Sequence, residues 1–319
     1  PVARPRSAAP AAAPQQNAPA DAEEARHRAK FAALQDYRTW LAERLAAEDT
    51  ARSLALAVTL VAPGAVDPFS PAGDVDPRVP RWFARARAIA GDDGVAWAML
   101  LSIASSSRRG TSTSVDALAV AWAEHDPDNL APWLHLTGDA AHPEEWLSRA
   151  LSPRARVTVH WLDVEAVTLA AYRRYPPPSP WREQLIGANG WDEEGPPLGL
   201  APPIALPPLQ RVATVCVPRD ARVKPPTACV PLGRTMVERS DTVLLANLGM
   251  SILRRADPGG RLPVDLRAQS RLSQWRFDQY TRLGERASLE AMAAYLGETM
   301  PLTEAGMILF ALEREGVRT

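Results

Sequence analysis

Three histidines lie close together in the middle of the chain, at positions 125, 135 and 142, with five carboxylates among them. Imidazole and carboxylate groups are suitable ligands for a divalent metal ion. No pair of these histidines has the i, i+4 spacing of an HExxH helix, however, and His142 precedes Pro143 at a predicted helix start. We therefore interpret His125, His135 and His142 as surface or capping residues and predict no metal site.

The sequence contains no pattern that identifies a catalytic nucleophile or a cofactor site. The Gly-Met-Ser sequence at 249–251 lacks the second glycine of a GxSxG elbow and lies inside a predicted helix. The adjacent carboxylates at 144–145 and 193–194 are typical of a solvated surface, and neither common type of phosphate-binding glycine loop occurs. We assign no catalytic, cofactor-binding or metal-binding residue. An envelope-acting enzyme, such as a helical hydrolase with a site assembled from distant helices, stays open as the alternative function.

The two cysteines, Cys216 and Cys229, flank a Pro-rich, charged loop of twelve residues. This arrangement predicts a disulfide that closes the loop, which would stabilise the fold by about 3 kcal/mol. Two buried free thiols are the alternative, and zinc is disfavoured because no CxxC pair or nearby histidine supplies further ligands. A disulfide indicates an oxidising compartment.

Two polar or aromatic segments are candidate contact points. Arg108 and Arg109 lie in a hydroxyl-rich run, 105–114, where they could bind an anion or a phosphate. A plain flexible connection between helices is the other interpretation of this run. Trp181 and Trp191 flank a Gly-containing segment and could anchor an interface, or they could hold the loop against the core. These four residues form the predicted interaction surface.

Composition limits the possible partners and locations. The net charge of −1 provides no global field that would attract nucleic acid, and no apolar run is long enough for a membrane span. With lysine only at 30 and 224, the abundance of Arg, Ala and Pro is typical of a GC-rich bacterial genome. Residues 1–20 are mostly Pro, Ala and small polar residues, so we expect a disordered linker. We expect this linker to follow a signal peptide that has been removed, a lipidated cysteine or an anchoring helix. We therefore expect a periplasmic or secreted protein, which includes a lipoprotein or a membrane-tethered form.

Apolar residues recur at helical spacing along most of the chain. Between Val79 and Ala150, the tryptophans at 82, 97, 122, 133 and 146 each lie in a predicted short helix bounded by turn residues. No alternating pattern predicts a strand. The other predicted helices are Asp21–Asp49, Ala51–Val61, Pro153–Tyr175, Leu209–Cys216, Cys229–Arg255, Val264–Leu283, Arg286–Leu296 and Thr303–Glu315.

The segment Val95–Trp146 resembles the tetratricopeptide repeat family. Pro127 precedes Trp133 by six residues and Leu136 follows three later, as at a junction between two repeats. The Trp-x-x-Leu spacing also occurs at 97–100, one repeat length upstream. The sequence departs from the family pattern where threonine replaces glycine at 137 and where the period breaks at Arg154. The resemblance implies stacked helical hairpins that bind protein on a concave surface.

Together these observations predict an all-α fold, an array of antiparallel helical hairpins like a tetratricopeptide or α-solenoid array, with Pro-rich loops and essentially no sheet. We expect a linker at 1–20, a helical-hairpin domain at 21–175, a Pro-rich connection at 176–228 and a C-terminal helical subdomain at 229–319 packed on the first. The predicted function is that of an exported bacterial scaffold that binds another protein. We predict no cofactor and no nucleic-acid partner.

Overall fold

Helices make up the regular structure of the protein. The computed structural model describes residues 18–62, 76–106, 114–136, 143–179, 181–185, 204–220, 222–256, 264–297 and 302–318. Within these ranges there are helices and two isolated parallel bridges but no strand, so the prediction of an all-α fold is confirmed. Of the linker predicted at 1–20, residues 1–17 lie outside the described residues; the prediction is wrong for its last three residues, which form the start of helix α1.

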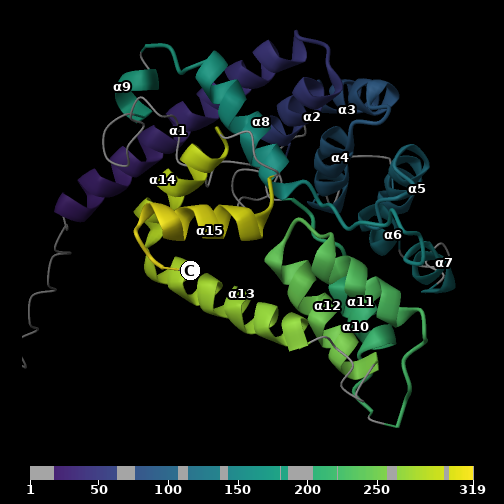
Figure 1. The fold of residues 1–319 in the computed structure, drawn as a ribbon. Helices are drawn as coiled ribbons and strands as arrows, with labels where there is room; N and C mark the ends of the chain where they lie inside the picture. Colours follow the sequence, from purple (N-terminus) through teal and green to yellow (C-terminus); the bar gives the residue numbers. More distant parts are fainter. Residues whose placement is uncertain are drawn as a thin grey trace, which may run out of the picture.

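In the N-terminal half, helix α2 lies among α1, α3 and α4 (Figure 1). Nearly every residue of α2 is buried, because its sequence is Leu, Ala and Val apart from Ser53, Thr59 and a single charged residue, Arg52. Thr50 caps its first turn by accepting a hydrogen bond from the Ser53 N–H. Helix α2 packs against α1, α3 and α4, α4 also packs against α5 and α8, and α9 packs on α1. The helices of this half are α1 (Ala18–Ala46), α2 (Ala51–Val61), α3 (Val79–Ile89), α4 (Gly94–Ser106), α5 (Val115–His125), α6 (Ala131–His135), α7 (Pro143–Arg149), α8 (Trp161–Arg174) and α9 (Trp181–Leu185).

The C-terminal helices form two groups. Helices α11 and α12 make an intimate pair with α10 beside α12, and α13 and α14 both pack on α15. Thr303 caps α15 by accepting a hydrogen bond from the Gly306 N–H. The helices are α10 (Leu209–Cys216), α11 (Cys229–Glu238), α12 (Val243–Ala256), α13 (Val264–Arg282), α14 (Glu285–Tyr295) and α15 (Glu304–Arg314).

Two apolar clusters hold these groups together. The main cluster extends from α1 through α8 and also includes side chains of α10, α11 and α12, so one core joins the two predicted helical regions. The second cluster is centred on α14 and α15 and receives side chains from α8 and α12. Its buried members are Leu162, Leu169, Val243, Met292, Tyr295, Met307, Ile308 and Leu312. Helix α8 therefore contributes to both cores.

Two predicted helices differ from the structure. The predicted helix Pro153–Tyr175 begins only at Trp161, and the residues before it are not helical. The predicted helix Cys229–Arg255 is divided into α11 and α12 by a break at 239–242. Both breaks have the same cause, since the bridge between Val157 and Ser240 pairs the two segments.

The end of the Pro-rich connection lies across the N-terminal helices. Ile204 and Ala205 pack on the main core, and the Ala205 N–H donates to the Ser102 hydroxyl of α4 at 2.6 Å. His135 of α6 hydrogen-bonds to the backbone of Ala205, and its burial lowers the pKa of the imidazole to about 4. The connection is thus tied to both α4 and α6, and His135 is a neutral core residue.

Two glycines allow α11 and α12 to approach closely. A Cβ at Gly249 would lie 2.7 Å from the Gly233 carbonyl oxygen and 2.7 Å from Met236 Cβ. Gly249, in the sequence that resembles part of a nucleophile elbow, is therefore a helix-packing residue.

We expect Gly249→Ala to lower the free energy of unfolding by about 2 kcal/mol, because the added methyl group must separate the two helices. Urea unfolding followed by circular dichroism measures the change. Ser251→Ala on the same helix serves as the control and should change stability by less than about 0.5 kcal/mol. A more stable Gly249→Ala protein would contradict the close packing.

Candidate functional site

A buried polar junction forms where the segment before α8 crosses the turn between α5 and α6. Asn129 is fully buried, and its side-chain amide donates to the Thr158 carbonyl at 2.9 Å. Its side-chain oxygen accepts from the N–H groups of Thr158 and Ala131, both at 3.0 Å. One side chain thereby satisfies three backbone groups that would otherwise be buried without partners.

Asp241, in the break between α11 and α12, binds the same segment from the other side. Its carboxylate accepts from the Val159 N–H at 2.9 Å and from the His160 N–H at 2.7 Å. Burial raises the pKa of Asp241, and these N–H donors oppose that effect. Glu304 extends the junction to α15, because its carboxylate accepts from the Val243 N–H and its own N–H donates to the Asp241 carbonyl.

His160 is the most constrained residue of the junction. Its backbone adopts a left-handed conformation, φ 62°, which is rare for a residue other than glycine and costs energy. Its Nδ1 lies 2.7 Å from the Asp163 carboxylate, an arrangement that fixes the ring as in an acid–base pair. Nε2 is buried without a hydrogen-bond partner in the described part of the chain and faces Gly94, at the start of α4. The imidazole is 16% exposed as a whole, and its buried Nε2 edge lies between the start of α4 and the start of α8.

A second cluster of aromatic side chains joins α1 to α8 and α9. The Tyr37 hydroxyl donates to the Tyr175 carbonyl at 2.7 Å, and the Tyr37 ring lies against Tyr172. Trp181 contacts Tyr37 and Trp40, with ring centroids 6.2 Å and 6.0 Å apart. Trp181, one of the four residues of the predicted interaction surface, is thus half-buried and holds α9 against α1.

Two ionisable side chains are buried beside this cluster. Arg38 of α1 is 4% exposed and Glu165 of α8 is 7% exposed, and the Tyr172 hydroxyl interacts electrostatically with both. Burial raises the pKa of Glu165 to about 8, partly opposed by a hydrogen bond from Trp161. Burial also lowers the pKa of the Arg38 guanidinium. Glu165 is therefore a neutral carboxylic acid at pH 7, and the surrounding helices enclose it.

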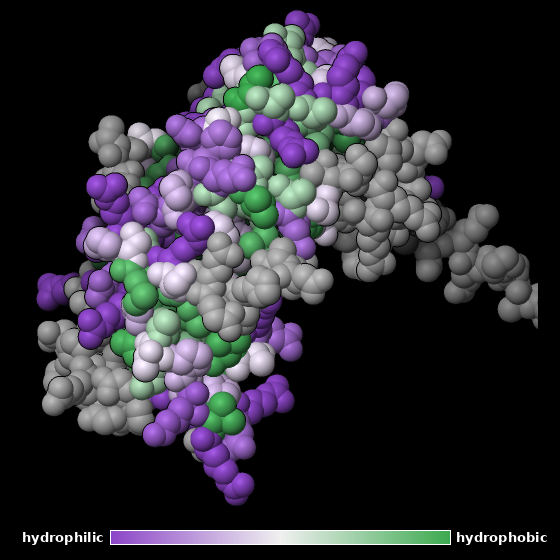
Figure 2. Space-filling view, turned by 90° about the vertical axis from the view of Figure 1, so that its right-hand side faces the viewer, coloured by the Kyte–Doolittle hydropathy of each residue, from purple (hydrophilic) through white to green (hydrophobic). Residues whose placement is uncertain are grey.

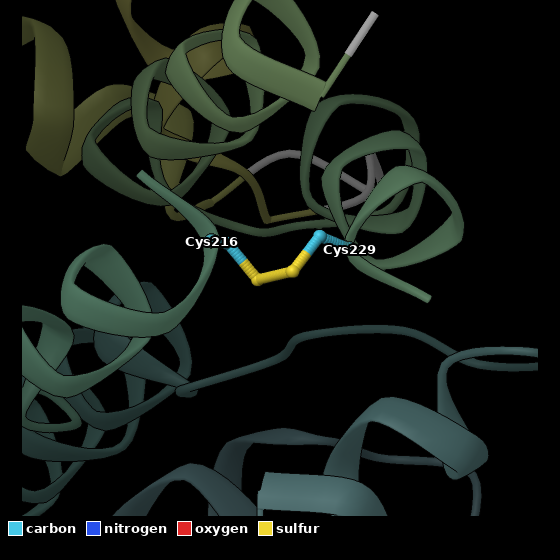
Figure 3. The surroundings of a disulfide bond; sticks show 2 residues. All are labelled: Cys216 and Cys229. Atoms are coloured by element: carbon cyan, nitrogen blue, oxygen red, sulfur yellow. A yellow bond between two sulfur atoms is a disulfide. The ribbon is translucent and has the colours of Figure 1, made fainter. Parts of the chain in front are cut away.

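The predicted disulfide is present between Cys216 at the end of α10 and Cys229 at the start of α11 (Figure 3). The two Cα atoms are 5.6 Å apart, and neither cysteine is exposed to solvent. The bond closes the loop between α10 and α11 next to the main core.

The remaining predicted residues do not converge. His125 stacks on Trp97 and lies near Asp92, whereas His135 is held by Ala205. In the described residues no group of three or more His, Cys, Asp or Glu side chains could hold a metal ion. Three residues of the predicted interaction surface, Arg108, Arg109 and Trp191, lie outside the described residues, as does His142.

An exposed apolar face on α13 was missed by sequence reasoning. Leu272 and Trp275 are each 40% exposed, one helical turn apart on α13, which forms the lower left edge of the molecule in Figure 1. On the inner face of the same helix, Phe277 and Tyr280 pack on the second core. The signal was a second apolar stripe, Leu-x-x-Trp, in an otherwise polar helix. We call Leu272, Trp275 and the exposed Arg271 and Arg282 the α13 face.

Comparisons with protein-family models, curated proteins and solved structures found no match to this chain. None of the helices in the described part of the chain has the length and apolarity that crossing a bilayer requires.

Removing the disulfide should destabilise the protein. We expect the double variant Cys216→Ala/Cys229→Ala to lose about 3 kcal/mol of unfolding free energy, because the unfolded chain gains the freedom of an open loop. Urea unfolding measures the loss, and each single variant should lose a similar amount because it also breaks the bridge. Protein isolated from its own host and unfolded in denaturant should show no reactive thiol before reduction, and two reactive thiols would contradict the bond.

Glu165 should make stability depend on pH. Between its ordinary pKa of 4.5 and its folded-state pKa of about 8, only the unfolded state ionises, so stability falls as the pH rises. The slope is at most about 1.4 kcal/mol per pH unit.

Glu165→Gln should remove this contribution to the slope, as measured by urea unfolding at a series of pH values. Glu238→Gln, at an exposed position of α11, is the matched control and should keep the wild-type slope. An unchanged slope in Glu165→Gln would show that Glu165 ionises normally in the folded protein.

Proposed function

We propose that this chain is an exported bacterial scaffold that binds another protein through its helical surface. The observation that carries the proposal is the α13 face. Tryptophan and arginine are the residue types that most often dominate protein–protein binding energy, and Trp275 is exposed between two arginines of one helix.

The residue types of the α13 face indicate what kind of partner surface would bind it. Leu272 and Trp275 require an apolar pocket, and the exposed Arg271 and Arg282 favour an acidic rim around it. Among the described side chains of α13, the one exposed acidic residue is Asp278, which accepts a hydrogen bond from Gln274. The proposed partner is therefore a protein with an apolar pocket bordered by carboxylates.

The location is proposed from the cysteines. A buried disulfide is compatible with an extracytoplasmic protein, because reducing systems in the cytoplasm keep most thiols reduced. Periplasmic or secreted proteins, including lipoproteins and membrane-tethered forms, belong to this class.

The helical-hairpin arrangement is also part of the proposal. Helices α1 and α2, α3 and α4, and α5 and α6 pack as sequential neighbours, as they would in a tetratricopeptide-like array. Such arrays present helix faces to partners, which supports binding as the function class. An enzyme would use a carboxylate with a raised pKa in an open cleft, and Glu165 has the raised pKa but is enclosed by α1 and α8.

We expect Trp275→Ala to reduce partner binding about 30-fold, because a central aromatic anchor contributes about 2 kcal/mol or more. The measurement begins with cross-linked capture from the native host and ends with titration of the purified partner. Leu272→Ala should have a smaller effect in the same direction.

Leu151→Ala provides the matched control, since Leu151 is 63% exposed and lies just after α7, outside the α13 face. Its binding should equal that of the unmodified protein. A captured protein whose recovery is independent of Trp275, or turnover of an envelope polymer by the chain alone, would overturn the proposal.

A further inference from the structure

We propose that the disulfide-closed loop between α10 and α11 docks on an anionic lipid surface. The loop, residues 217–228, is described at 217–220 and 222–228, which extend beyond helices α10, α11 and α12 and form the lowest protrusion in Figure 1. This site is separate from the α13 face and does not depend on the proposed protein partner.

Positive charge is concentrated in this part of the chain. Residues 209–256 contain eight arginines and lysines and three acidic residues, a net charge of +5 in a chain whose total is −1. Asp241, one of the three acids, is turned inward at the junction. The near-neutral total therefore conceals a local basic surface that can attract anions.

Three of these cations lie in the loop itself. Arg219, Arg222 and Lys224 are exposed, and none has an ion-pair partner among the described residues. Between the last two lies Val223, whose side chain is 50% exposed. In Figure 2 the lower end of the molecule, where the loop lies, shows hydrophilic side chains around a small hydrophobic spot.

The loop is held in one shape before any partner arrives. The disulfide closes its base, and the Arg255 guanidinium donates to the carbonyls of Asp220 and Val223 at 3.0 Å and 2.7 Å. Prolines at 218, 225 and 226 further restrict the backbone. Binding consequently orders few additional residues, which lowers its entropic cost.

The geometry favours a lipid surface over an acidic protein. The loop protrudes from the helices and contains no aromatic residue, whereas protein interfaces usually bury large aromatic side chains at their centre. An aliphatic tip among cations suits a bilayer, where the valine enters the interface and the cations meet anionic headgroups.

Co-sedimentation with vesicles tests this inference. The chain should bind phosphatidylethanolamine vesicles that contain phosphatidylglycerol, should bind phosphatidylcholine vesicles far more weakly, and should lose binding as salt is raised. Each basic side chain near an anionic surface contributes about a factor of five, so Arg219→Gln/Arg222→Gln/Lys224→Gln should weaken binding on the order of 100-fold. Val223→Ser should weaken it about ten-fold.

The matched control neutralises three exposed arginines on other helices, Arg81, Arg87 and Arg173. Their triple glutamine variant should bind as well as the unmodified chain, and an equal loss would show that only total charge matters. A Val223→Cys protein with a polarity-sensitive dye gives an independent readout, because the two native cysteines are bonded and buried. Its emission should shift to the blue on anionic vesicles. Equal binding to both vesicle types, no blue shift, or binding only to an acidic protein would overturn the proposal.

Discussion

The rest of the structure depends on two side chains, Asn129 and Asp241, that satisfy the backbone of the segment before α8. A non-helical segment inside a helical protein has N–H and C=O groups without local partners, and burying them unpaired costs about 1–3 kcal/mol each. Asn129 and Asp241 supply those partners from opposite sides. The segment can therefore run through the interior and connect α5 and α6 with α11, α12 and α15.

This junction explains why α8 belongs to both apolar cores. The extended backbone ends at His160, whose left-handed conformation redirects the chain into the first turn of α8. From there, Val164 and Tyr172 face the main core, while Leu162 and Leu169 face the second. Glu165 of α8 is buried near Arg38 of α1, and burial shifts the pKa of both side chains away from their ordinary values.

The two candidate surfaces differ in what makes them available. The α13 face is exposed because the inner side of that helix, with Phe277 and Tyr280, already satisfies the second core. The loop of 217–228 protrudes beyond the helices, and the disulfide at its base and the Arg255 guanidinium of α12 fix its shape there. The sequence predicted this loop and its disulfide. It did not predict a basic surface there, because acidic residues elsewhere in the chain bring the total net charge close to zero.

The sequence by itself determined the helical class, the bounds of α2 and α10 and the cysteine pairing, because capping residues, apolar spacing and loop length act locally. Only the tertiary structure decided where α8 begins and where α11 ends. Those limits depend on hydrogen bonds between residues 29 and 82 positions apart, which local periodicity cannot reveal. The same holds for Trp275 and Trp181. Helical spacing predicted a helix for Trp275 but only a loop for Trp181, and the packing of neighbouring helices left Trp275 exposed and Trp181, on α9, half-buried.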